Sequence, residues 1–160
     1  MRFATATCLL LLSASLAPAV AEAQSGRDSA SLNAALDHYA SLTVQMASDS
    51  ISALYAPDGV LAATGRAPIQ GPDSIRAFLE TFRAYHVLSD TMRADGLIVW
   101  GDTAWQSGTF RQHVLVPAGD TVFAHGRFLF MWVRGAAGTW QIHWASTRPW
   151  PASGKAPDVK

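Results

Sequence analysis

Histidines are the residues in this sequence whose type could bind a metal or transfer a proton, and there are five of them. His113, His125 and His143 fall on three successive segments rich in β-branched and aromatic residues, which is typical of strands. If Val116 pairs with Thr121 across a tight loop, His113 and His125 point to opposite faces of the sheet. His113 and His143 would share a face but lie roughly 20 Å apart along the strands. Zinc ligands must lie about 2 Å from one point, so the sequence predicts no metal site.

His125 is the best candidate for a general acid or base, because an unperturbed imidazole titrates with a pKa of about 6.5. The same pairing places His125 on one face of the sheet with Gln112. Tyr39 lies on the apolar stripe of an expected helix, so Tyr39 or Gln112 is the candidate to hold a developing oxyanion. The structural alternative is that His125 bonds to the backbone and Tyr39 packs in the core. The predicted ligand pocket consists of Tyr39, Gln106, Gln112, His125, Trp144 and Ser146.

Carboxylates are absent from the three segments expected to form the pocket strands, which are Thr103–Val116, Thr121–Arg134 and Thr139–Ser146. Asp49 stands where a helix N-cap belongs, and Asp58 stands in a Pro-Asp-Gly turn. Both positions have an ordinary structural explanation. The sequence therefore favours binding over acid–base catalysis.

The elements that must position these residues divide into helices first and strands afterwards. Apolar residues at spacings of three and four predict a helix over 30–47, a short helix over 51–55 and a third over 73–85. Pro72 stands at the start of the third helix, a position that proline favours. Two further strands are expected at His86–Ser89 and Gly96–Trp100. Helices followed by hairpin-connected strands indicate an α+β fold with the helices on one face of the sheet.

Several segments together resemble one known superfamily. They are Asp49–Val60, Pro68–Gly71, Ser74–Leu79, Gly126–Arg134 and Gly138–Ile142. Their order and spacing resemble the nuclear transport factor two-like (cystatin-like) domains, and within these the SnoaL-like and calcium/calmodulin-kinase association-domain-like groups of small bacterial proteins. The resemblance implies a cone, in which a strongly curved antiparallel sheet of about four to six strands packs on three N-terminal helices. It also implies an internal pocket and a homodimer through the outer face of the sheet.

The resemblance also suggests which face of the sheet points inward. The segment Trp140–Trp144 is similar to a Trp-x-Ile hairpin that faces the core in this superfamily, so Trp140, Ile142 and Trp144 are expected inside. On the predicted pairing, Phe128 and Phe130 then lie on the outer face. An outer face of this aromatic character is expected to meet a second subunit.

The two ends of the chain are expected to lie outside the domain. Met1-Arg2, an apolar run and small residues before position 24 predict a cleavable signal peptide over 1–23. Residues 24–150 then form a single SnoaL-like domain, and 151–160 a flexible tail. Cys8, the one cysteine, falls in the signal, so the exported domain is expected to contain no disulfide. We expect a secreted or periplasmic bacterial protein without a membrane contact after cleavage.

Three hypotheses for function remain open. The first is an exported domain that binds a small hydrophobic molecule without an assigned activity. The second is an enzyme of the isomerase, cyclase or dehydratase type that transfers protons on a hydrophobic substrate, and the third is a dimeric scaffold. Net charge is zero and no run of Lys or Arg occurs, so no nucleic-acid partner is expected. No fingerprint for a dinucleotide or a phosphate-binding loop is found, so no cofactor is predicted.

Overall fold

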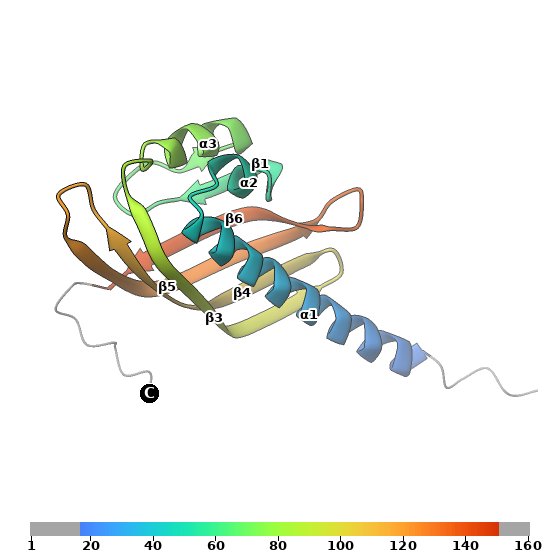
Figure 1. Cartoon of the computed structure of the whole chain (residues 1–160). Coiled ribbons are helices and arrows are strands. Elements are labelled where there is room, and N and C mark those ends of the chain that lie inside the picture. Colours follow the sequence, from blue (N-terminus) through green and yellow to red (C-terminus); the bar gives the residue numbers. More distant parts are fainter. Residues whose placement is uncertain (1–16, 151–160) are drawn as a thin grey trace, which may run out of the picture.

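A computed structural model describes residues 17–150 of the chain, with side chains from residue 24 onward. The elements within these residues follow the α+β order that the sequence predicts (Figure 1). The predicted signal peptide over 1–23 and the predicted tail over 151–160 lie outside the described residues, apart from backbone 17–23. The helices are α1 (Ala17–Val44), α2 (Ser48–Ser52) and α3 (Pro72–Glu80), and the strands are β1 (Tyr55–Ala62), β2 (Ile69–Gln70), β3 (His86–Trp100), β4 (Thr103–Leu115), β5 (Thr121–Arg134) and β6 (Trp140–Pro149).

The six strands form one curved sheet in the order β2-β1-β6-β5-β4-β3. The expected antiparallel sheet is corrected to a mixed one, because the last strand, β6, lies beside β1 and runs parallel to it. The other four pairs are antiparallel. Helix α1 crosses the concave face of the sheet, while α2 and α3 lie over the end that carries β1 (Figure 1).

Helix α1 holds the sheet through one apolar stripe. Leu32, Leu36 and Ala40 recur every four residues, so they share one face of the helix, and all three are buried. This stripe packs in one core with Phe130 and Trp132 of β5. Burial of such side chains contributes about 1.5–3 kcal/mol each, which is the main force that fixes α1 over the sheet.

Strand β3 is one continuous strand of 15 residues, whereas the sequence predicted two short strands at His86–Ser89 and Gly96–Trp100. The register with β4 shifts by one residue between Val87 and Ser89 and again between Ala94 and Gly96. Pairing with β4 therefore continues along the whole of β3. A bulge of this kind inserts one residue without ending the strand. The continuous strand therefore contains Asp90, which lay outside both of the strands predicted from the sequence.

The segment after α2 also differs from expectation. The predicted helix over 51–55 is replaced by α2, which ends at Ser52, and β1 already begins at Tyr55. The predicted Pro-Asp-Gly turn lies inside β1, where the register with β6 shifts between Tyr55 and Val60. Gly59 is required there, because a Cβ would come within 2.7 Å of the Ile142 carbonyl oxygen. Asp49 lies in the first turn of α2 and makes no cap hydrogen bond.

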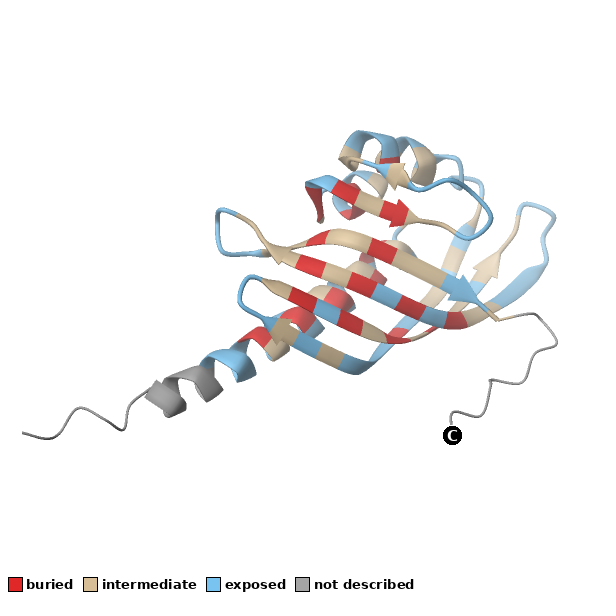
Figure 2. Cartoon of the chain, turned by 180° about the vertical axis from the view of Figure 1, so that it is seen from behind, coloured by how far each residue is buried: buried red, intermediate tan, exposed pale blue. Residues whose placement is uncertain are grey.

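The pairing of β4 with β5 is shifted by one residue from the predicted pairing. Leu115, not Val116, lies opposite Thr121, and the Val116 N–H donates to the Asp120 carbonyl at 2.9 Å, so the loop is one residue longer. Since side chains alternate along a strand, a shift of one residue exchanges the two faces of β5. Buried and exposed residues alternate along β4 and β5 in Figure 2. Phe128 and Phe130, predicted outside, therefore face α1.

A bulge in β6 divides the side chains that were expected to share the inward face. Trp132 lies opposite Ile142, but the neighbouring Met131 lies opposite Trp144, so His143 is an extra residue. Ile142 is buried in the core, whereas Trp144 shares the outer face with Met131. The expectation that Trp140, Ile142 and Trp144 all point inward is therefore wrong for Trp144.

Candidate functional site

A cavity of about 450 Å³ lies at the end of the molecule where α3 approaches the sheet. Its wall combines one side of α1, the apolar face of α3 and the inner faces of β1, β3 and β4. Most of the lining is aliphatic or aromatic, with few polar groups. The lining residues are Tyr39, Thr43, Met46, Ser48, Ile51, Leu61, Ala63, Phe78, Leu79, Phe82, Tyr85, Val87, Gln112, Val114, Val116, Val122 and Thr147. Such a pocket suits a small, mostly apolar molecule.

Tyr39 lines the cavity, and the hydroxyl of a second tyrosine, Tyr55, lies close to the Tyr39 hydroxyl. Tyr39 projects from α1 and packs edge-on against Phe130, with ring centroids 5.1 Å apart. Burial raises the pKa of Tyr39 to about 12, and the nearby Tyr55 hydroxyl offsets part of this rise. Burial also raises the pKa of Tyr55 well above its usual value, and among the described residues the Tyr55 hydroxyl makes no hydrogen bond of good geometry. Both groups are therefore neutral at physiological pH and able to donate a hydrogen bond.

Asp90 brings a carboxyl group close to Tyr39, beside the cavity but not among its lining residues. It lies directly opposite Gln112, while Val87 lies opposite Val114, and all three of these neighbours line the cavity. Both Asp90 carboxylate oxygens are buried, and neither makes a hydrogen bond of good geometry within residues 24–150. Burial raises the pKa of Asp90 to about 6, although the Gln112 side chain and the Thr91 N–H offset part of the rise. Asp90 therefore changes its protonation state close to physiological pH.

This arrangement contains the parts that proton transfer requires. A carboxyl group with a pKa of about 6 can accept and return a proton near neutrality. A neutral tyrosine hydroxyl can stabilise negative charge that develops on a ligand oxygen. The mostly apolar wall strengthens both interactions when a ligand fills the cavity and displaces water from it.

Of the residues predicted for the pocket, Tyr39 and Gln112 line the cavity. His125 does not, because the shifted pairing places it opposite Arg111 on the outer face. There its ring stacks on Phe123 with centroids 5.0 Å apart and meets Trp150 edge-on at 5.1 Å. Its role as a base stays a prediction that this position does not favour.

Gln106 is fully buried, but it joins α1 to the sheet rather than lining the cavity. Its amide nitrogen donates to Asn33 Oδ1 at 2.9 Å, and its oxygen accepts from Trp132 Nε1 at 3.0 Å. Trp144 and Ser146 lie opposite Met131 and Leu129 on the outer face, so neither reaches the cavity. Of the six predicted pocket residues, two line the cavity, Gln106 lies in the core, and the other three lie on the outer face of the sheet.

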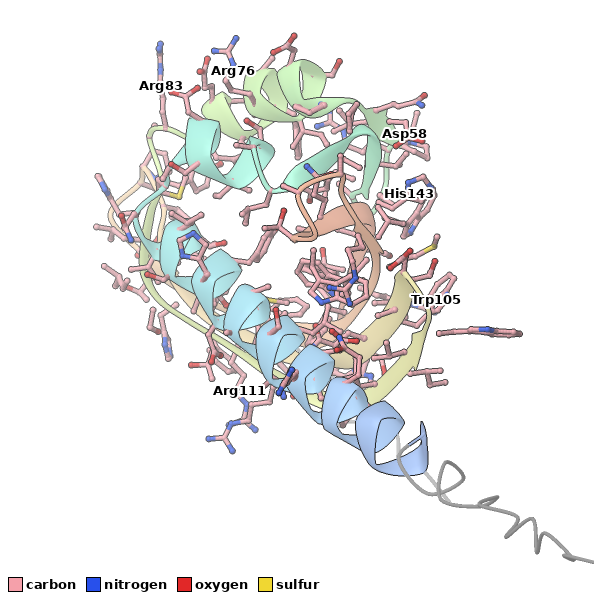
Figure 3. All side chains as sticks on the ribbon, turned by 90° about the vertical axis from the view of Figure 1, so that its right-hand side faces the viewer. Asp58, Arg76, Arg83, Trp105, Arg111 and His143 are labelled. Carbon is pink, nitrogen blue, oxygen red and sulfur yellow. The ribbon has the colours of Figure 1, made fainter. Side chains whose placement is uncertain are left out.

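Histidines do not gather into a metal site in the part of the chain that the structure describes, where no three His, Cys, Asp or Glu side chains are suitably placed. The prediction that His113 and His125 lie on opposite faces is wrong, since both flank Phe123 on the outer face. His143 lies instead 3.4 Å from Asp58, Nδ1 to Oδ1, and both labelled side chains lie together outside the sheet in Figure 3.

Asp90 and Tyr55 were not among the residues predicted for the pocket, and for Asp90 the reason is physical. Asp is unfavourable in strands and common in turns, so Ser89-Asp90 indicated an interruption. The signal that could have found Asp90 is the β-favouring alternation that continues through Thr91 and Met92.

Within the described residues, no helix is sufficiently long and apolar to span a membrane.

The chain belongs to the SnoaL-like domain family, whose characteristic sequence matches residues 35–143. No curated protein matches the chain. This membership agrees with the helix α1, the curved sheet and the cavity between them.

Solved structures support the same fold. An NTF2-like protein with a cystatin-like fold from Novosphingobium aromaticivorans is 20% identical, with a TM-score of 0.73 over 88% of this chain and 93% of the other. A ketosteroid isomerase-like protein from Erwinia carotovora atroseptica is 22% identical, with a TM-score of 0.69 over 75% and 94%. A Xanthomonas campestris structure described as a calcium/calmodulin dependent protein kinase II association domain is 20% identical, with a TM-score of 0.61 over 76% and 86%. Identities this low show the fold and leave the activity open.

Proposed function

We propose that this protein binds a small, mostly apolar molecule in the cavity and exchanges a proton with it through Asp90. The observation that carries the proposal is a buried carboxyl group, whose oxygens make no hydrogen bond of good geometry within residues 24–150, beside an apolar cavity of about 450 Å³. An unpaired buried carboxyl group disfavours folding, so its position calls for a use. Among the hypotheses from sequence, this one is the proton-transferring enzyme, with Asp90 in place of His125.

The chemistry is a proton shift beside a carbonyl group. The Asp90 carboxylate accepts a proton from a carbon next to the carbonyl, and the C–H electron pair forms a carbon–carbon double bond. The carbonyl electron pair moves to oxygen, where the Tyr39 O–H donates a hydrogen bond to the developing charge. Asp90 then returns the proton to carbon, which restores the carboxylate. The likeness to a ketosteroid isomerase-like protein supports this class of reaction.

Binding is tested first, with the neutral apolar dye Nile red as the probe. Thr43 lines the cavity from α1, so Thr43→Trp should fill it and reduce dye affinity at least 10-fold. Ser41 is exposed on the same helix, so Ser41→Trp is the matched control and should bind like the wild type. Equal dye binding by both variants would remove the cavity as the binding site.

Proton exchange is tested with enolisable cyclic ketones in D₂O, by following loss of the α-proton NMR signals. The wild type and Asp37→Asn, which alters an exposed carboxylate of α1, should speed exchange equally. Asp90→Asn should reduce the rate at least 100-fold while dye binding persists. Dye binding without any exchange in the wild type would leave binding alone as the function. Export through residues 1–23 and pairing of two copies remain separate predictions.

A further inference from the structure

The outer face of the sheet carries a second, chemically different cleft. Thr91 lies opposite Arg111, and Arg93 lies opposite Thr109, so the two arginines occupy diagonal positions on β3 and β4. These four side chains alone line a cleft of about 310 Å³. Met92, which stands between Thr91 and Arg93, is buried in the core. The cleft therefore opens on the side of the sheet away from the apolar cavity.

Neither arginine in this cleft has an acidic partner within residues 24–150, where the ion pairs involve other arginines. Arg127, by contrast, pairs with Asp95 on the same outer face. Diagonal neighbours on a sheet are close enough to interact, and like charges there repel each other. Two neighbouring guanidinium groups without an acidic partner favour the entry of a negative group between them.

Two further arginines lie on the same face, and one of them, Arg127, is paired with Asp95. Arg127 lies opposite Thr109, and Arg148 lies opposite Arg127 in turn. The whole chain has a net charge of zero, so the arginines on this face are a local excess and not part of a generally basic surface. Arg111 projects away from the body of the molecule, as Figure 3 shows, which leaves its guanidinium open to a ligand.

We propose that the cleft between Arg93 and Arg111 binds a doubly charged oxyanion, of the phosphate monoester or sulfate type. Each guanidinium presents a planar set of N–H donors that suits two oxygens of such a group. The hydroxyls of Thr91 and Thr109 supply two further donors between them. A tetrahedral oxyanion has enough oxygens for all four groups, whereas a carboxylate has two. The ligand site stands on the opposite face from Asp90 and does not depend on the proposed function.

The test measures binding of phenyl phosphate by calorimetry at constant ionic strength, so that general screening is held fixed. The wild type should show saturable binding that the double variant Arg93→Gln/Arg111→Gln weakens at least 10-fold. The control Arg27→Gln/Arg83→Gln removes the same charge from two exposed positions elsewhere and should keep wild-type affinity. Circular dichroism and light scattering establish that all three proteins are folded and of equal size.

Each outcome decides the proposal. Loss of binding confined to the cleft variant supports it, and parallel measurements with sulfate and with phosphatidic acid vesicles separate a soluble ligand from a lipid headgroup. Equal weakening in both double variants would show general charge attraction and overturn it. Absence of saturable binding in the wild type would overturn it too. A change in oligomeric state for the cleft variant would assign the arginines to a subunit contact instead.

Discussion

Replacing the Asp90 carboxyl group should stabilise the protein at neutral pH and leave it unchanged in acid. In the unfolded chain the carboxyl titrates near 3.8, whereas burial raises its pKa to about 6 in the folded protein. Well below pH 3.8 the group is protonated in both states and does not affect stability. As pH rises from 3.8 to about 6, the unfolded state loses the proton first, so stability falls. The loss is complete about one pH unit above the folded pKa.

The expected magnitude follows from the same two values. The difference between 3.8 and about 6, at about 1.4 kcal/mol for each pH unit, gives about 3 kcal/mol. Asp90 is partly exposed as a residue although its oxygens are buried, so solvent screening reduces this to about 2 kcal/mol. For a domain of this length, about 2 kcal/mol corresponds to a change in Tm of about 7 °C.

The assay is thermal and urea unfolding of the wild type, Asp90→Asn and Asp37→Asn at pH 4.0 and pH 7.5. Asparagine keeps the size of the side chain and cannot ionise, so only the charge is removed. We expect Asp90→Asn to unfold about 7 °C higher at pH 7.5 and at nearly the wild-type temperature at pH 4.0. Asp37→Asn should follow the wild type at both values. An equal shift at both pH values, or destabilisation at pH 7.5, would refute the reasoning.

Three further changes test the packing and the outer face. Gln106→Leu should lower the free energy of unfolding by about 1–3 kcal/mol, measured with urea, because it leaves the buried Trp132 N–H without its acceptor. Gly108→Ala should cost at least about 3 kcal/mol, since a Cβ there would overlap backbone of the facing strand, whereas Gly26→Ala meets open space and should cost nothing. If two copies pair through the outer face, Trp105→Glu should shift the mass in light scattering from dimer to monomer; an unchanged mass would exclude this part of the face. Trp105 is 45% exposed and projects from the sheet (Figure 3).

The fold could be predicted largely because its signals are local. The spacing of Leu32, Leu36 and Tyr39 defines one face of a helix, and the alternating apolar residues of β4 and β5 define strands. These patterns depend on neighbours three or four residues away, which a sequence displays directly. Tyr39 was placed on the side that faces the cavity for this reason, whereas Gln112 was placed there through the strand pairing and the resemblance. The roles of both residues in the proposed reaction stay predictions.

The faces of β5 and β6 could not be predicted, because they depend on single-residue events between strands. The loop before Thr121 holds one residue more than the tightest pairing allows, and His143 is an extra residue in β6. Either event exchanges the side chains that point inward with those that point outward. Neither the longer loop nor the extra residue in β6 can be recognised from amino-acid composition. Both loop lengths suit the Gly119-Asp120 turn equally. His125 was therefore assigned to the cavity although it packs on Phe123 outside.

Asp90 opposes both the local preference of its strand and the packing of the core. At the sequence level the residue argues against a strand, and in the folded protein its carboxyl costs about 2 kcal/mol at neutral pH by the reasoning above. An aliphatic residue at this inward position would satisfy the strand propensity and the core together. A position that departs from both local and global preference is where a functional group is to be expected. Gln112 and Tyr39 line the cavity beside that carboxyl, so under the proposed function the stability that Asp90 removes from the fold is the cost of keeping a protonatable group inside it.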